Sequence, residues 1–375
     1  MNVRMGSPLQ SEPTLSVPRE IGRGTILDRW RLPDGTLYLD NAATRPMLPE
    51  VAEEMARLMA NNPLNASSQH KYGQKAARML EDARNFFKSE LNVPSTGELI
   101  FNSGATEGLN MLLKSAYFAD PTKNHIVTVK TEHKAVLNTC AYLETTGAEV
   151  TYLDVDDWGQ VSVSDVEAAT RSTTCAVCVT WVNNETGALL NIQELSLLCK
   201  VKNVKLLVDG TQALGKHDCN LEQLDGVDCL VGSAHKLGGP IGVGFAWCRS
   251  VDVVMPAILG GGQEFDKRSG TVNVAGIVAF QRAWENFSVG ADDCTNAKKE
   301  LAWLTKAELD VMSRSDDRFS PYIIVAKASA SRLDFVRRSK VSVSFGGACS
   351  SGLEAGSHVY RQVFGDRDDL IRISF

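Results

Sequence analysis

Hydrophobic positions recur along the chain with two different periods. Between residues 47 and 91 they follow helical spacing, as in Val51, Met55 and Leu58, and predict amphipathic helices over 47–60 and 73–91. From residue 98 onward, short apolar runs alternate with helical stretches. The strands predicted in this part are, in chain order, 98–102, 125–130, 149–155, 175–182, 204–209, 229–233 and 243–248, and the helices between them begin near Thr106 and cover 133–145 and 192–202.

Strands that alternate with helices are typical of an α/β fold, in which a mostly parallel sheet is sandwiched by helices. After Gly262 this alternation weakens. A long helical stretch over 293–314, the apolar run Tyr322–Val325 and the strand-like Val341–Ser344 predict a smaller α+β domain. The expected organisation is an N-terminal arm or leader over 1–36, a large domain over 37–284 and a small C-terminal domain over 285–375, which the segment near 37–50 can join.

The composition indicates the class of protein and the partners that it is not expected to bind. The chain has 375 residues, 43% of them hydrophobic and 22% charged, as in a soluble globular protein of about two domains. Its net charge of −6 argues against binding to nucleic acid or to a membrane surface. No apolar run approaches the ~20 residues that cross a bilayer. Residues 1–34 mix basic and acidic side chains without an apolar core, so a secretory signal is not expected.

The nine cysteines indicate a reducing compartment, because they are odd in number and scattered through apolar segments. We therefore expect a cytoplasmic location, with an organellar matrix as the alternative. Cys175 and Cys178 form a Cys-x-x-Cys pair on a predicted strand, where residues three apart point to opposite faces. They are interpreted as small buried hydrophobic residues, and no metal site is expected.

Three segments carry candidate chemistry. Ser103–Gly108 lies where a strand turns into a helix, which suits a phosphate group, although taken alone such residues are more often a plain helix cap. Asp209 ends an apolar strand at the edge where ligands of α/β folds bind. Ser233-Ala234-His235-Lys236 offers a lysine at a strand end, where desolvation suits it to Schiff-base chemistry, whereas an arbitrary lysine is usually a solvated surface residue. Together these segments are the parts that a pyridoxal phosphate site requires.

Ten segments of this sequence resemble the motifs of cysteine desulfurases, a group of class V aminotransferases with the type I fold of pyridoxal-phosphate enzymes. The resemblance runs from about Tyr38 to Phe375 and keeps the order of the motifs. The matching segments are Tyr38–Thr44, Asn65–His70, Ser103–Glu107, Thr131–Val136, Val182–Gly187, Val208–Gln212, Ser233–Lys236, Gly260–Glu264 with Arg268–Thr271, Ala348–Gly352 and Ile371–Ser374.

The resemblance implies a role for each residue around the cofactor ring. Lys236 would form the Schiff base and later move protons on the substrate carbon. Asp209 would pair with the pyridine nitrogen, and His133 would stack on the ring, although a residue at a helix start can also serve as a cap. Gln212 would bond the ring oxygen, and Asn184 would lie close to that oxygen and to the substrate carboxylate.

The same resemblance implies the phosphate and substrate contacts. Thr271 would reach the phosphate of a neighbouring subunit, so a homodimer is expected. Arg372 would clamp the carboxylate of the substrate, L-cysteine, a task that suits a planar guanidinium. The residues expected to hold the phosphate within one subunit are Ala105, Thr106, Ser233 and His235.

Cys349 decides between reaction types. It lies in a Gly- and Ser-rich stretch, Phe345–Gly352, of the kind that exposes a thiol. The resemblance implies that this thiol takes the sulfur of L-cysteine as a persulfide, leaves L-alanine, and passes the sulfur to an acceptor protein, as in iron–sulfur cluster assembly. The sequence does not identify the base that activates the thiol, and His133 is our hypothesis.

Two features depart from the family pattern. Arg45 stands where a second threonine is common, and the chain ends soon after Arg372, where a helical tail is expected. Two alternatives therefore stay open. One keeps the cofactor in a selenocysteine lyase or in a desulfurase dedicated to one biosynthetic sulfur transfer. The other is a catalytically impaired scaffold that binds a partner in sulfur transfer or iron–sulfur assembly.

Overall fold

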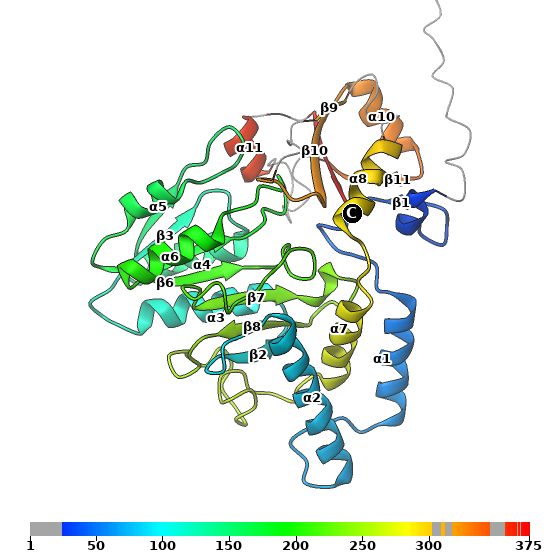
Figure 1. The fold of residues 1–375 in the computed structure, drawn as a ribbon. Coiled ribbons are helices and arrows are strands. Elements are labelled where there is room, and N and C mark those ends of the chain that lie inside the picture. Colours follow the sequence, from blue (N-terminus) through cyan, green and yellow to red (C-terminus); the bar gives the residue numbers. More distant parts are fainter. Residues whose placement is uncertain (1–24, 302–308, 312–316, 346–356, 366, 368) are drawn as a thin grey trace, which may run out of the picture.

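The computed structural model describes residues 25–301, 309–311, 317–345, 357–365, 367 and 369–375. Its centre is a seven-stranded sheet with the order β2-β8-β7-β6-β5-β3-β4 (Figure 1). Strands β3 to β7 are mutually parallel, and β8 lies antiparallel between β7 and β2. The strands are β2 (Glu98–Asn102), β3 (His125–Val129), β4 (Glu149–Leu153), β5 (Thr174–Thr180), β6 (Lys205–Asp209), β7 (Cys229–Ser233) and β8 (Gly244–Cys248).

Helices cover both faces of this sheet, as predicted for the α/β class (Figure 1). Along β6, Leu206 and Val208 join one hydrophobic core and Leu207 joins the other, because successive strand residues point to opposite faces. The core around Leu207 contains α3 (Ala105–Phe118) and α4 (Lys134–Glu144). The opposite core contains α2 (Lys71–Glu90), α6 (Ile192–Lys202) and α7 (Val274–Glu285), and α1 (Pro49–Asn61) packs on α7.

A second, antiparallel sheet lies towards the C-terminal end of the chain, with the order β12-β13-β10-β9. Residues near the N-terminus pack against this part: β1 (Leu37–Tyr38) pairs with β11 (Val341–Ser342), and the ring of Trp30, in the short helix η1 (Ile26–Trp30), lies 5.0 Å from that of Phe375. The limits near residues 37 and 285 stay predictions. The remaining elements are α8 (Ala291–Glu300), β9 (Leu309–Val311), β10 (Ile323–Ala328), α10 (Ala330–Arg338), β12 (Ser344–Phe345), α11 (His358–Phe364) and β13 (Leu370–Ser374).

The predicted helix over 293–314 is too long. Helix α8 ends at Glu300, and Leu309–Val311 form a strand that pairs with β10. Pairing with a neighbouring strand decides the structure of so short an apolar run, and its periodicity cannot tell helix from strand. Four further helices were not predicted from the sequence: α7, α10, α11 and the short helix α5 (Val163–Ala169).

The eight cysteines in the described residues are all buried and free. The expectation that Cys175 and Cys178 point to opposite faces is wrong, since both pack into the core around Leu207. The reason is a shift of register between β3 and β5: His125 pairs with Thr174 but Ile126 pairs with Ala176, so Cys175 is the extra residue.

Candidate active site

Three strands of the central sheet end side by side in polar residues. Asp209 is the last residue of β6, Ser233 the last of β7, and Thr180, the last of β5, pairs in register with Asp209. The short helix η2 (Ala234–Lys236) follows β7 directly and carries Lys236. This is the carboxyl edge of the parallel strands, where ligands of open α/β sheets bind.

The turn between β2 and α3 has the features of an anion site. Gly104 begins the helix with φ +140°, a conformation that side chains disfavour, and an added Cβ there would lie 3.2 Å from the Ser233 hydroxyl. That hydroxyl accepts the N–H of Ala105 at 2.8 Å, while Gly104, the residue before α3, offers no side-chain cap. The cap therefore comes from Ser233 at the end of β7 and not from a threonine or serine of this turn, and Thr106 is exposed in the first helical turn.

Lys236 and Gln212 meet at one backbone carbonyl. The Nζ of Lys236 donates to Ala42 O at 2.8 Å and to Ala43 O at 2.6 Å, and the Nε2 of Gln212 donates to Ala42 O at 2.8 Å. The Nδ1 of His235 lies 3.1 Å from the Oγ1 of Thr44 in the same stretch. The stretch 42–44 therefore brings together three of the predicted site residues.

Asp209 and His133 lie close enough to Lys236 for their charges to interact. Asp209 is buried and accepts the N–H of Thr211 at 3.0 Å. Burial lowers the pKa of His133, and the charge of Lys236 acts in the same direction while that of Asp209 opposes it. The Nδ1 of His133 accepts the N–H of Ala135 at 3.1 Å, so the histidine does cap α4. The cap occupies one ring nitrogen, and stacking on a cofactor stays a prediction.

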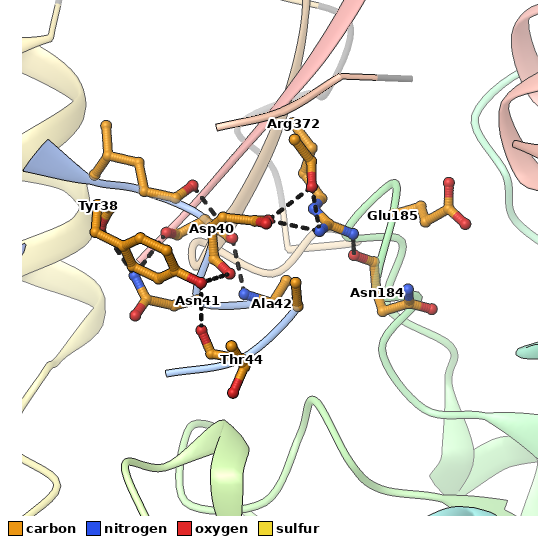
Figure 2. Close-up of polar contacts among 12 residues, drawn as sticks. Tyr38, Asp40, Asn41, Ala42, Thr44, Asn184, Glu185 and Arg372 are labelled. Carbon is orange, nitrogen blue, oxygen red and sulfur yellow. Dashed lines mark hydrogen bonds and ion pairs between the residues drawn. The ribbon is translucent and has the colours of Figure 1, made fainter. Parts of the chain in front are cut away.

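The guanidinium of Arg372 lies in the region between Asp40 and Asn184 (Figure 2). Its Nη2 donates to Asp40 Oδ1 at 2.7 Å and to Ser344 Oγ at 2.9 Å, and its Nη1 donates to Asn184 O at 2.9 Å. Arg372 is 2% exposed. The structure thus brings Arg372 and Asn184 together as predicted, whereas Asp40 and Ser344 were missed.

Two further ionisable residues near the site were missed. Glu132 is buried, which raises its pKa to about 8, although the backbone N–H and the hydroxyl of Thr180 both donate to its carboxylate. Lys216 donates to Gln212 Oε1 at 3.1 Å, and burial together with the nearby charges of Arg45 and Lys236 lowers its pKa to about 7. The four-residue spacing between Gln212 and Lys216 is the signal that could have revealed this contact.

The predicted site is not complete within the residues described. Thr271 is exposed and makes no hydrogen bond to any of the groups above within the described part of the chain. Cys349 lies outside the described residues. Over that same part of the chain, no group of three or more His, Cys, Asp and Glu side chains could hold a metal ion. No described helix is long and apolar enough to cross a membrane.

A family model described as Aminotransferase class-V matches residues 37–375, and the chain belongs to this family. Members of the family depend on pyridoxal phosphate. One relative, the cysteine desulfurase IscS of Dictyoglomus turgidum, is 37% identical over 343 residues, which cover 86% of this chain and 84% of the relative.

Solved structures agree with this assignment. A structure described as SspA in complex with cysteine superposes with a TM-score of 0.82 at 28% identity, covering 90% of this chain and 98% of that chain. A NifS-like protein gives a TM-score of 0.82 at 32% identity, covering 91% and 93%. The predicted fold class and family resemblance are confirmed.

Proposed function

We propose that this chain is a pyridoxal-phosphate-dependent cysteine desulfurase, which converts L-cysteine to L-alanine and transfers the sulfur to Cys349 as a persulfide. The observation that carries the proposal is that Lys236, Asp209 and His133 lie together at the carboxyl edge of the sheet. There the charges of Lys236 and Asp209 both act on His133. A lysine, a carboxylate and an aromatic ring are the groups that this cofactor uses.

The residues at the edge fit the cofactor. A buried carboxylate such as that of Asp209 calls for a positive partner, which a protonated pyridine nitrogen provides. Gly104 has φ +140°, a conformation that side chains disfavour, and a Cβ there would lie 3.2 Å from the Ser233 hydroxyl, so the turn at the start of α3 suits glycine. When bound, pyridoxal phosphate supplies an electron sink. The residues that would hold it are Ala105, Thr106, Ser233 and His235 at the phosphate, and His133, Asn184, Asp209, Gln212 and Lys236 at the ring.

The substrate would be held by Arg372 and Asn184. Arg372 is already oriented by Asp40 and Ser344, so its guanidinium is fixed before a carboxylate arrives. Its ion pair with Asp40 balances the charge of a buried cation in the absence of substrate. Lys236 would take the proton from the substrate α-carbon and return a proton at the end of the reaction.

Both ends of the segment that carries Cys349 are anchored beside the proposed substrate residues. On one side Ser344 pairs with Arg372. On the other side the hydroxyl of Ser357 donates to the carboxylate of Glu185, the neighbour of Asn184. These two anchors support the proposal that Cys349 can reach the bound substrate.

The sulfur transfer needs no external oxidant. The thiolate of Cys349 attacks the sulfur of the substrate, a sulfur–sulfur bond forms, and the bond between that sulfur and the β-carbon breaks with the electron pair going to carbon. Protonation of the carbon completes L-alanine. Because an ordinary thiol of pKa ~8.5 is only a few per cent ionised at pH 7, a base is required, and we propose His133.

Exposed apolar side chains support a homodimer. Ile241 is 79% and Leu259 84% exposed, and Val253, Met255 and Ile258 add to this surface. Contiguous exposed apolar side chains mark interaction surfaces, and we place these residues in the dimer interface. The stretch leads into Thr271, which in the proposed dimer would reach the phosphate of the neighbouring subunit. A sulfur-acceptor protein and a cytoplasmic location complete the proposal.

Replacing Cys349 tests the function. Cys349→Ala should keep the visible absorbance of bound cofactor and its spectral response to L-cysteine. It should make little alanine and carry no persulfide, as measured by amino-acid analysis and by mass spectrometry after alkylation. Cys199→Ala, which removes a buried thiol, is the matched control.

Each other result points to one of the alternatives. Parental turnover by Cys349→Ala would contradict the proposal and favour a lyase that releases sulfide or selenide directly, which the rates on L-cysteine and L-selenocysteine would then separate. A parent protein that binds no cofactor would be the catalytically impaired scaffold.

A further inference from the structure

Strand β2 is at the edge of the central sheet, with β8 on one side and, among the described residues, no strand on the other. Every second residue of this segment directs its backbone N–H and C=O groups to the free side. Side chains form hydrogen bonds with these groups where a neighbouring strand would otherwise do so. Leu99 O accepts from Arg84 Nη1, Phe101 N donates to Glu264 Oε2 at 2.7 Å, and Ser103 N donates to Glu107 Oε2 at 2.9 Å. The last of these bonds lies in the turn proposed to hold the phosphate.

The carboxylate that binds Ser103 is itself held by the loop over residues 257–270. Arg268 Nε donates to Glu107 Oε1 at 2.9 Å, and both side chains are largely buried. Burial raises the pKa of Glu107, but the hydrogen bonds from Arg268 and Ser103 outweigh it and lower the pKa overall. Glu107 is therefore an ionised carboxylate whose Oε2 binds the turn and whose Oε1 binds the loop.

The 257–270 loop is fixed firmly enough to act as a support. Glu264 forms a buried two-bond ion pair with Arg84, at 2.8 and 3.0 Å. Glu264 and the two residues after it all have positive φ, between 47° and 62°, a conformation that costs free energy in residues other than glycine. Ser269 N also donates to Ile258 O at 3.0 Å.

We propose that Glu107 and Arg268 position the phosphate-binding turn, acting on the cofactor through Ser103 and Gly104 and without touching it. This inference rests on the proposed function, because it concerns the same cofactor site. The turn must keep Gly104 at φ +140° beside the Ser233 hydroxyl, and it follows a strand that, among the described residues, pairs with another strand on one side only. Glu107 supplies the missing second side, and Arg268 fixes the carboxylate in place.

The sign of one effect separates positioning from simple electrostatics. Glu107 is an anion close to the proposed site of another anion, so Coulomb repulsion alone predicts that Glu107→Ala binds the phosphate more tightly. Positioning predicts the opposite. Pyridoxal lacks the phosphate, so its Kd should not depend on how the turn is positioned.

The experiment strips the full-length protein of cofactor and titrates it with pyridoxal phosphate or with pyridoxal, following absorbance and tryptophan fluorescence. For Glu107→Ala we expect the Kd of pyridoxal phosphate to rise about tenfold and that of pyridoxal to change less than about twofold. Arg268→Gln should act in the same direction, and Arg268→Lys should recover part of the affinity. Glu107→Gln, which still offers Ser103 an oxygen, should fall between parent and Glu107→Ala.

The control is Glu149→Ala, which removes an exposed ion pair with Arg171 at the other end of the strands and should bind as the parent does. Unchanged or tighter binding of pyridoxal phosphate by Glu107→Ala, or an equal loss for both ligands, would overturn the inference while leaving persulfide formation on Cys349 intact. A parent that binds pyridoxal phosphate but forms no persulfide would overturn the proposed function alone, and a parent that binds neither ligand would overturn both.

Discussion

The two ends of the central parallel strands carry similar residues but use them differently. At the amino end, the ring nitrogens of His125 lie 2.8 and 2.9 Å from the hydroxyls of Thr174 and Thr151, so both are occupied. At the carboxyl end, His235 has one such contact, from Nδ1 to Thr44. No second contact to its ring is found within the described part of the chain.

Electrostatics does not distinguish the two histidines. Burial lowers the pKa of His125 and of His235 to about 4, so each is neutral at pH 7. The difference is in the hydrogen-bonding capacity that the fold leaves unused. A polar group whose bonds are complete supports the structure, and a buried one with capacity to spare can serve a ligand.

The largest expected effect comes from Lys236, at the carboxyl end of the strands. Lys236→Ala should lower alanine formation at least about a thousandfold, because the amine that binds the cofactor and moves the proton is gone. Reduction with borohydride followed by peptide mapping should find no cofactor on the variant. Cofactor trapped at the same yield on another lysine would contradict the assignment.

Two aspartates, one at each end of the strands, test the comparison directly. Asp209→Asn should keep the cofactor but lower activity on the order of a hundredfold, because the ring nitrogen loses its ionic partner. Asp228, near the amino end of β7, accepts the N–H of Leu206 at 2.8 Å, and an amide oxygen can replace it there. Asp228→Asn should therefore keep parental kcat and KM. Equal effects of the two substitutions would refute the distinction between the two ends.

The two histidines should separate stability from binding. His235→Ala should weaken the binding of pyridoxal phosphate about tenfold and change the free energy of unfolding little. His125→Ala should lower the free energy of unfolding by about 2–4 kcal/mol, since it leaves a cavity and removes one hydrogen-bond partner from each of two hydroxyls, without changing the Kd of the cofactor. Urea unfolding and cofactor titration of both variants provide the measurements.

The smallest effect is a pH dependence of stability. His125, His217 and His235 have pKa values lowered to about 4 by burial, against 6.5 when unfolded. The unfolded chain therefore binds more protons between these values, and the stability should be complete above pH 6.5 and fall as the pH drops towards 4. His125→Asn should make this decline shallower in urea unfolding at pH 7, 5.5 and 4.5. An unchanged slope would show that His125 does not contribute.

The sequence predicted the central part of the fold well. The strand Glu98–Asn102 and the helix Ile192–Lys202 agree with their predicted limits, because continuous hydrophobic patterns and short loops specify them locally. Of the residues that the motifs named, the structure brings Lys236, Gln212 and His235 to the stretch 42–44, and their roles stay predictions. Prediction failed for short elements, such as β9, whose conformation depends on a neighbour distant in the sequence.

What the sequence by itself determined is the α/β class, the family and the residues that can carry the chemistry, since periodicity and motif order are properties of the chain. Only the tertiary structure decided how those residues are supported. Asp40 binds Arg372 across 332 residues, and Arg268 reaches Glu107 across 161. Such pairs leave no local pattern, because their hydrogen bonds exist only once the sheets and loops have packed together.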